Sequence, residues 1–172
     1  MICPTCAHDN LPGSEHCSNC LHDLTQLDQP TAQDRVERSL MDDPVSGLKP
    51  RQAVTLPATA TVGEAIQTML ASDIGALLVV DESGRLVGIF SERDLLTKVA
   101  TISDYAGRPV RDFMTARPET VRQTHTLAFA VHKMDGGGYR HLPVLEDGHP
   151  LGMISVRDML RHITRLCQCQ SK

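Results

Sequence analysis

The feature that most constrains this chain of 172 residues is an internal repeat that follows Pro44. A shift of 65 residues superposes four pairs of positions: Val45 on Val110, Thr55 on Thr120, Thr61 on Thr126 and Leu77 on Leu142. After a turn that is one residue shorter in the second copy, a shift of 64 aligns GIFSERDLL (88–96) with GMISVRDML (152–160). This length change falls in a predicted loop, where it is tolerated, so the two halves are copies of one unit.

Each copy is predicted to contain a strand, a helix, two strands and a second helix. In the first copy a short strand near 53–56 precedes a helix that begins at Thr61, where Thr61-x-x-Glu64 forms a capping box. Nearly continuous apolar runs predict the paired strands: 76–80 with 86–90, and 141–145 with 150–154. The sequence therefore predicts an α+β fold built from two β-α-β-β-α units. A unit of about 55 residues has a marginal core, so we expect the two units to pack against each other.

The last helix of each unit opens with the same polar motif, Ser-x-Arg-Asp, at 91–94 and 155–158. Serine at the N-cap and aspartate three residues later can simply cap the helix. The arginine needs another explanation, because a cation in the first turn opposes the helix dipole. An anion bound at the helix N-terminus would explain the arginine. The aspartate carboxylate can accept hydrogen bonds from a ribose diol. The motif favours a ribonucleotide site, with capping alone as the simpler alternative.

This order of elements, with a glycine-led Ser-x-Arg-Asp at the last junction, resembles the CBS domain, and two in tandem resemble a Bateman module. VRDFMTARPETV (110–121) is similar to the approach to such a domain, and YRHLPVL (139–145) is similar to its second strand. The first copy departs from both patterns, with VSGLKP (45–50) and IGALLVV (74–80). The boundaries that we expect are 43–104 for CBS domain 1, 105–166 for CBS domain 2 and 167–172 for a tail.

The resemblance implies a non-catalytic regulatory protein, a homodimer, that binds adenine nucleotides (AMP, ADP or ATP) in clefts of the pair. Aspartates at the positions of Asp94 and Asp158 would hold ribose hydroxyls, and basic residues at the positions of Arg140 and His141 would meet phosphates. The nucleotide-binding residues that it implies are Thr55, Ile74, Ser91, Arg93, Asp94, Thr120, Tyr139, Arg140, His141, Ser155, Arg157 and Asp158. The two sites should differ, because the first copy has glycine and alanine where the second has Arg140 and His141.

Four cysteines precede the repeat. They form two C-x2-C pairs, Cys3 with Cys6 and Cys17 with Cys20. Thiolates from two tight knuckles can converge tetrahedrally on one ion, which predicts a structural Zn²⁺ with no open position for catalysis. Disulfides, which suit secreted chains, and another metal are the alternatives. Residues 1–24 resemble a small zinc ribbon, and such ribbons usually carry glycine where Ala7 and Leu21 stand here.

Polar segments follow the cysteines and end the chain. Residues 25–42 are predicted to be a linker that contains a short helix, because Thr31-x-x-Asp34 resembles a capping box and apolar residues follow at helical spacing. Cys167 and Cys169 lie among the last residues, where disorder is common, and we interpret them as a frayed thiol pair.

Charge is divided unevenly along the chain. Residues 1–98 hold 7 Lys or Arg against 14 Asp or Glu, whereas residues 99–172 hold 10 against 7. An anionic ligand would therefore find its counter-charge mainly in the second half. Residues 1–34 contain no Lys or Arg, and phosphate binding depends on such cations, so we expect the ribbon to contact an unidentified protein partner and not nucleic acid.

Two other classes of function compete with the nucleotide sensor. In one, the protein is a nucleic-acid-binding or protein adaptor whose Ser-x-Arg-Asp motifs only cap helices. In the other, it is a redox enzyme that uses the C-terminal thiols. Neither explains the doubled motif. No apolar segment has the length of a membrane span, and MICPTC lacks the basic region and apolar core of a signal peptide, so we expect a cytoplasmic protein with no membrane contact.

Overall fold

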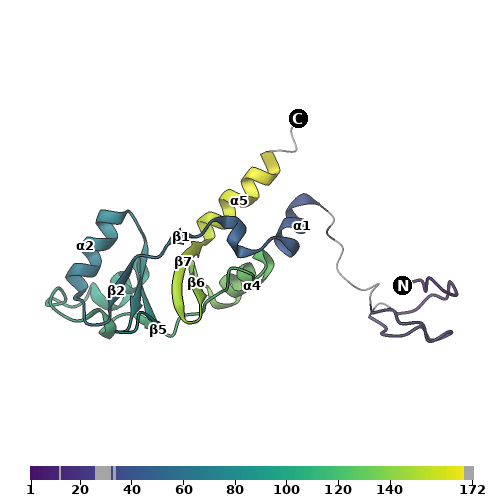
Figure 1. The fold of residues 1–172 in the computed structure, drawn as a ribbon, viewed down its shortest axis with the longest axis horizontal. Helices are drawn as coiled ribbons and strands as arrows, with labels where there is room; N and C mark the ends of the chain where they lie inside the picture. The colour runs from purple at the N-terminus through teal and green to yellow at the C-terminus, as the bar shows by residue number, and fades with distance from the viewer. Residues whose placement is uncertain (12, 26–31, 33, 169–172) are drawn as a thin grey trace. The chain divides into compact units, whose positions relative to one another are not determined.

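The protein contains two compact units, Met1–Asp34 and Arg35–Lys172 (Figure 1). The structure, a computed structural model, describes residues 1–11, 13–25, 32 and 34–168. Thr31 of the predicted capping box and Cys169 lie outside these residues. The first unit holds the four cysteines and the second holds the internal repeat, whose helices and strands confirm the predicted α+β class.

The elements of the repeat follow the predicted order. The first copy contains β2 (Thr55–Pro57), α2 (Val62–Ser72), β3 (Ala76–Val80), β4 (Leu86–Ser91) and α3 (Glu92–Asp94), followed by the π-helical turn η2 (Leu95–Val99). The second copy contains α4 (Leu127–Gly137), β6 (His141–Glu146), β7 (His149–Ser155) and α5 (Val156–Gln168). Its counterpart of β2 is reduced to one parallel bridge between Val121 and Val144.

A lead segment precedes each copy. The first lead consists of α1 (Arg35–Asp42), the 3-10 turn η1 (Val45–Leu48) and β1 (Arg51–Gln52), and the second consists of the 3-10 turn η3 (Val110–Asp112) and β5 (Thr115–Ala116). The short helix expected within the linker corresponds to α1. Leu40 on this helix packs against the core of the second copy.

Helix α2 begins where its capping box predicts. The Thr61 hydroxyl accepts from the Glu64 N–H at 3.2 Å, and a Glu64 carboxylate oxygen accepts from the Thr61 N–H at 2.7 Å. In the second copy the Thr126 hydroxyl accepts from the Phe129 N–H at 3.3 Å. Both helices therefore start at a threonine that satisfies a backbone N–H left free by the first turn.

The two lead segments are exchanged between the copies. One sheet has the strand order β1-β7-β6 and the other has β2-β3-β4-β5. Strand β1 of the first lead pairs antiparallel with β7, where Gln52 lies opposite Gly152. Strand β5 of the second lead pairs antiparallel with β4, where Ala116 lies opposite Gly88. Each sheet is therefore completed by the copy to which it does not belong in sequence.

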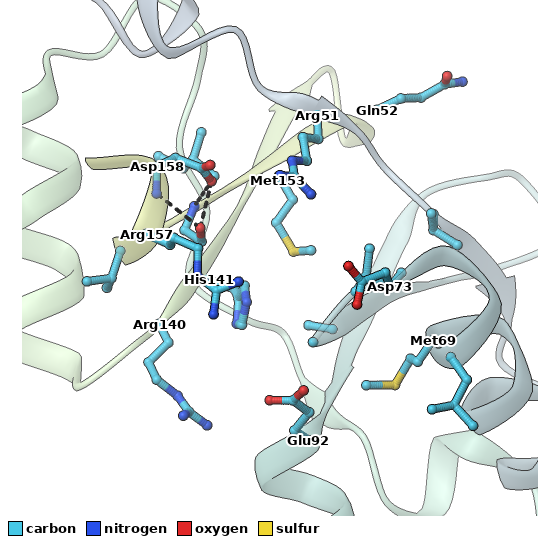
Figure 2. A pocket seen from close by; sticks show the side chains of 18 of the residues that line it. Arg51, Gln52, Met69, Asp73, Glu92, Arg140, His141, Met153, Arg157 and Asp158 are labelled. Atoms are coloured by element: carbon cyan, nitrogen blue, oxygen red, sulfur yellow. Dashed lines mark hydrogen bonds between the residues drawn. The ribbon is translucent and has the colours of Figure 1, made fainter. Parts of the chain in front are cut away.

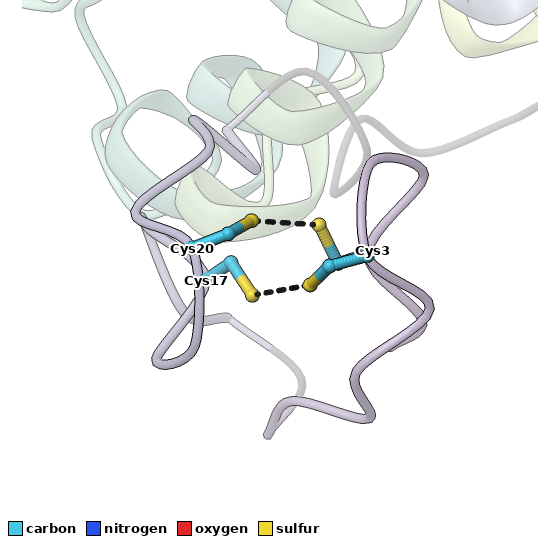
Figure 3. Close-up of side chains that lie close together, drawn as sticks. Cys3, Cys17 and Cys20 are labelled. Carbon is cyan, nitrogen blue, oxygen red and sulfur yellow. Dashed lines mark hydrogen bonds between the residues drawn. The ribbon is translucent and has the colours of Figure 1, made fainter.

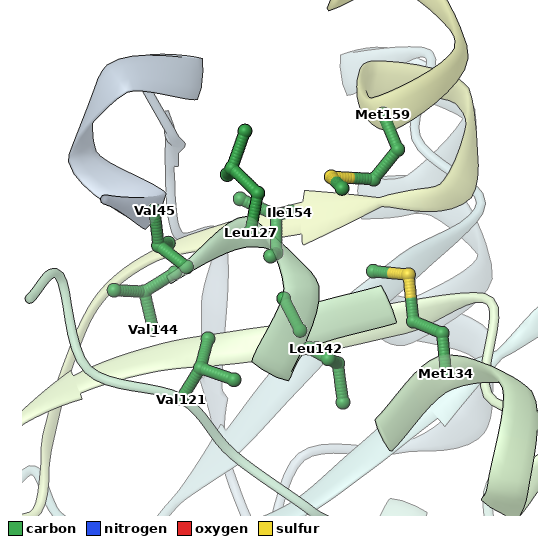
Figure 4. Close-up of a cluster of buried hydrophobic side chains, with 9 residues drawn as sticks. Val45, Val121, Leu127, Met134, Leu142, Val144, Ile154 and Met159 are labelled. Atoms are coloured by element: carbon green, nitrogen blue, oxygen red, sulfur yellow. The ribbon is translucent and has the colours of Figure 1, made fainter. Parts of the chain in front are cut away.

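Backbone hydrogen bonds repeat this exchange symmetrically. The Val45 N–H donates to the His125 carbonyl at 2.8 Å, and the equivalent Val110 N–H donates to the Ala60 carbonyl at 2.8 Å. The side chains of Val45 and Val110 are fully buried, each in the core of the other copy. Figure 4 shows Val45 among the side chains of the second core. Because neither copy completes its core alone, the two copies must fold as one body.

Strand β3 is buried on both faces, which explains its continuous apolar sequence. Leu77 and Val79 belong to the core that contains α2. Ala76 and Leu78 face the opposite way, in a cluster that includes Met153 of the second copy. The two copies therefore pack against each other, as predicted, and this cluster shows that the contact is made through their sheets.

Helix α5 extends to Gln168, so Cys167 lies on a helix with an exposed side chain, inside what the sequence predicts as a tail. In the part of the chain that the structure describes, no helix has both the length and the apolar character that crossing a bilayer requires.

Candidate functional site

A cleft of about 540 Å³ lies between the two copies of the repeat (Figure 2). The first copy and its lead contribute residues of β1, the end of α2 and the start of β3. The second copy contributes the end of β7 and the first turns of α5, together with Arg140 and His141. Figure 2 shows Arg140, His141 and Asp158 facing Asp73 and Glu92 across this cleft. A bound molecule would therefore contact both copies.

Asp158 presents one carboxylate oxygen to the cleft. Its Oδ2 atom accepts from the Ser155 N–H at 2.9 Å and from the Ser155 hydroxyl at 2.6 Å. Its Oδ1 atom has one ion-pair partner among the described residues, Arg161 at 3.6 Å, and the Asp158 side chain is 23% exposed. The capping interaction thus fixes the carboxylate and leaves Oδ1 able to accept further hydrogen bonds.

The lining of the cleft carries more positive than negative charge. Its ionised side chains are four arginines (Arg51, Arg140, Arg157 and Arg161) and three carboxylates (Asp73, Glu92 and Asp158). Burial lowers the pKa of His141, and the neighbouring Arg140 lowers it further, so this imidazole is neutral at pH 7. The charge favours an anionic ligand, and His141 can act as a neutral hydrogen-bonding group.

The first-copy motif has a different environment. Asp94 is 5% exposed, and its Oδ2 atom accepts from the Ser91 N–H at 3.0 Å and the Ser91 hydroxyl at 2.7 Å, as in the second copy. Its Oδ1 atom lies 2.6 Å from the Lys98 ammonium and accepts from the Thr115 hydroxyl at 3.1 Å. Both oxygens of Asp94 are therefore paired within the protein.

The structure brings together half of the residues that the resemblance implies. Those that line the cleft are Ile74, Arg140, His141, Ser155, Arg157 and Asp158. Ile74 belongs to the first copy and yet lies with the motif of the second. Arg51 and Glu92 also line the cleft and are not among the residues that the sequence predicts for it. Nothing in the sequence marks Arg51, because its equivalent in the second copy is Ala116.

The other implied residues lie outside this lining. They are Thr55, Ser91, Arg93, Asp94, Thr120 and Tyr139. Arg93 donates to the Gly138 carbonyl at 3.5 Å, and the Tyr139 ring lies against Gly137, where an added Cβ would come within 1.9 Å of it. Arg93 of the first motif therefore contacts the second copy, whereas the Tyr139 ring packs within its own copy.

The four N-terminal cysteines converge as their spacing predicts. Their Sγ atoms all lie within 4.8 Å of one another. The Sγ atoms of Cys3 and Cys20 are 3.6 Å apart, as are those of Cys6 and Cys17. Figure 3 marks these two contacts with dashed lines. Ala7 and Leu21 follow the two knuckles with φ angles of 55° and 59°, the left-handed conformation that glycine adopts easily. The knuckles form without glycine.

Hydrogen bonds within this cluster shift the pKa values of its thiols in opposite directions. Although burial opposes ionisation of Cys17, hydrogen bonds from the backbone of Cys20 and Asn19 lower its pKa to about 6. The backbone of His22 also lowers the pKa of Cys20, but the hydrogen bonds with other thiols outweigh it and raise this pKa to about 12. Four adjacent thiolates repel one another, so full ionisation requires a cation between them, and this donor set fits Zn²⁺.

Family comparison confirms the resemblance of the repeat. A family model described as the CBS domain matches residues 38–101 and 110–165. The chain belongs to the CBS-domain family. It contains two CBS repeats in tandem, preceded by a cluster of four cysteines that could hold a metal ion.

Curated relatives and solved structures share this CBS pair. The CBS domain-containing protein CBSCBSPB1 of Arabidopsis thaliana is 33% identical over 117 residues, which cover 67% of this chain and 22% of that much longer protein. An uncharacterized 17.7 kDa protein of Acidianus ambivalens is 32% identical over 118 residues, 68% of this chain and 71% of that one.

Among solved structures, the CBS-domain protein ATU1752 from Agrobacterium tumefaciens has a TM-score of 0.62 and 35% identity, and the match covers 68% of this chain and 88% of that one. The CBS domain protein PAE2072 from Pyrobaculum aerophilum, solved in complex with AMP, has a TM-score of 0.63 and 30% identity. This match covers 71% of this chain and 98% of that one. These two solved proteins are similar to this chain in fold as well as in sequence.

Proposed function

We propose that this protein is a non-catalytic regulatory CBS pair that binds an adenine nucleotide in the cleft that contains Asp158. The observation that carries the proposal is the Asp158 carboxylate in a cationic cleft. The capping serine binds its Oδ2 atom, and Oδ1, which lies 3.6 Å from Arg161, can still accept hydrogen bonds from a ligand. The Pyrobaculum aerophilum relative, which binds AMP, supports the choice of ligand.

Each part of a nucleotide has a suitable group in the cleft. Asp158 Oδ1 can accept hydrogen bonds from the ribose hydroxyls, and Ser155 holds it in place before the ligand arrives. The guanidinium groups of Arg140 and Arg157 can bind phosphate oxygens in a bidentate manner. Apolar side chains from both copies, Ile66, Met69, Ile74 and Met153, offer a surface for the base.

Regulation would follow from the position of the ligand between the copies. A ligand shifts an equilibrium between two packings by the difference in its affinity for them, and a nucleotide that touches both copies has such a difference. We further propose that the protein forms a homodimer and that the acidic N-terminal unit, with structural Zn²⁺ on Cys3, Cys6, Cys17 and Cys20, relays the change to a protein partner. A thiolate site of this kind is suited to the reducing cytoplasm.

Isothermal titration calorimetry with AMP, ADP and ATP tests the proposal. Asp158→Asn keeps one oxygen for the Ser155 hydrogen bonds but replaces the ribose acceptor with an NH2 group. We expect this variant to bind the preferred nucleotide at least about tenfold more weakly than the wild type, as the loss of a hydrogen bond to a charged acceptor implies. Asp94→Asn makes the same change in the first-copy motif, where both carboxylate oxygens are already paired, and should leave the nucleotide affinity unchanged. If Asp158→Asn and the wild type bind the nucleotide with equal affinity, Asp158 is not part of the site. If no nucleotide binds, the two Ser-x-Arg-Asp motifs serve only as helix caps.

A further inference from the structure

The two copies carry the same Ser-x-Arg-Asp motif but differ in what faces its aspartate. The Asp94 side chain is 7% exposed and the Asp158 side chain is 23% exposed. The partners of the Oδ1 atom differ between the copies. In the first copy they are Lys98 at 2.6 Å and Thr115 at 3.1 Å, whereas in the second copy Arg161 lies 3.6 Å away and Asp158 lines the cleft.

Lys98 is fully engaged around the first motif. Its ammonium lies 2.6 Å from Asp94 Oδ1 and donates to the carbonyls of Phe113 at 2.9 Å and Met114 at 3.3 Å and to the Thr115 hydroxyl at 3.3 Å. These four acceptors share the three N–H donors of the lysine. Because Phe113 and Thr115 belong to the second lead segment, Lys98 ties the first motif to the segment that crosses over from the second copy.

The equivalent position in the second copy is His162, at an offset of 64 residues. The His162 ring does not reach Asp158 but makes a 2.7 Å hydrogen bond through Nε2 to the buried hydroxyl of Ser39 on α1. Its Nε2 atom also lies 4.0 Å from an Asp43 carboxylate oxygen. Helix α1 therefore holds this side chain away from the second motif.

The partner of Thr115 also changes. The residue 65 positions earlier, in the first lead segment, is Pro50. Proline has no side-chain donor and no N–H, so it cannot bond Asp158 as the Thr115 hydroxyl bonds Asp94. Two substitutions between the copies, Lys98 to histidine and Thr115 to proline, thus leave Asp158 Oδ1 with a 3.6 Å ion pair to Arg161, where Asp94 Oδ1 has a 2.6 Å ion pair and a hydroxyl donor.

We propose that Lys98 is a built-in cation that keeps the first motif closed, so that each chain binds one nucleotide, at Asp158. This inference rests on the proposed function and specifies its stoichiometry. In the first copy a ribose would have to displace an ammonium and a hydroxyl from Asp94, and the ammonium would lose its short ion pair. Asp94 is therefore a structural residue, and the sequence difference at 98 and 162 decides which copy receives the ligand.

The test is the stoichiometry of nucleotide binding measured by titration calorimetry in three proteins. The wild type should bind one AMP per chain. Lys98→Met, which keeps the length of the side chain and removes its charge, should raise this to two. His162→Lys should introduce the same closure into the second copy and weaken binding by at least about tenfold, as expected when a cation competes for the acceptor. Two sites in the wild type, one site in Lys98→Met, or unchanged affinity in His162→Lys would each overturn the inference.

Thermal unfolding without nucleotide separates this inference from the proposed function. Lys98→Met should lower Tm by several degrees, because it leaves the buried Asp94 carboxylate without its cation. Arg161→Met is the matched control, since it removes the longer and more exposed ion pair to Asp158 and should change Tm much less. If no nucleotide binds but this difference in Tm is seen, the proposed function fails and the closure by Lys98 stands. If the two variants unfold at the same temperature, the closure itself is refuted.

Discussion

Gly152 is the residue at which the exchange of lead segments can be tested most simply. It pairs with Gln52 where β1 crosses onto β7. A Cβ atom added at Gly152 would lie 2.6 Å from the Arg51 carbonyl oxygen and 3.0 Å from the Cβ atom of Pro50. The first contact is with backbone, which cannot rotate away, so Gly152→Ala must push β1 off the edge of the sheet.

We expect this substitution to destabilise the CBS pair by about 2 kcal/mol, the middle of the range for overpacking, and to lower Tm by roughly 5–10 °C. AMP affinity should fall as well, because Arg51 and Gln52 line the cleft. Gly136→Ala is the matched control: Gly136 lies on α4, an added Cβ has nothing within 4 Å, and alanine should stabilise the helix by about 0.5–1 kcal/mol. Differential scanning calorimetry of both variants measures the effect. A Tm of Gly152→Ala equal to that of the wild type would refute the crossing of β1 onto β7.

Three further predictions concern the metal site and the cleft. A strong Zn²⁺ chelator should make the four N-terminal thiols reactive towards a thiol reagent without changing the Tm of Arg35–Lys172, because each unit is compact by itself; a large fall in that Tm would contradict this. Leu21→Gly should slow the loss of Zn²⁺ to the chelator, since it removes a left-handed strain on the order of 1 kcal/mol, whereas faster loss would show that leucine at this position is favourable. The pKa of His141 is lower in the folded protein than in the unfolded chain. On acidification the unfolded chain therefore takes up the proton at a higher pH, and the free energy of unfolding falls as pH drops below about 6.5. His141→Gln should therefore lose less stability on acidification than the wild type in urea titrations, and an equal loss would exclude His141 as a source of the acid sensitivity.

The elements of the repeat could be predicted from sequence because their signals are local. Strand β3 covers the residues that the apolar run predicts, and Thr61 and Thr126 start the helices that their capping patterns predict. The spacing of the cysteines likewise determines their convergence, because each knuckle brings two thiols together over a few residues.

The exchange of the leads could not be predicted in the same way. Strands β1 and β5 have two residues each, too few for an apolar period to show which sheet they join. The order of the chain therefore predicts that each lead belongs with the copy that follows it, and it predicts no role for Arg51.

The difference between the two motifs depends on that exchange. Asp94 and Asp158 are equivalent in sequence, and the local pattern gives both the same cap. Thr115 reaches Asp94 from 21 residues away, through a strand that belongs to the other copy. Periodicity and spacing carry no information on such a contact, so the closed state of Asp94 becomes visible only in three dimensions.

The central claim is that the nucleotide is held at Asp158 and not at Asp94. A crystal structure of the protein grown with excess AMP tests it most directly. We expect one AMP per chain, with its ribose hydroxyls on Asp158 Oδ1, its phosphate on the arginines of the cleft, and the ion pair between Lys98 and Asp94 intact. An AMP whose ribose is bound by Asp94, or one that leaves Asp158 without contact, would contradict the account.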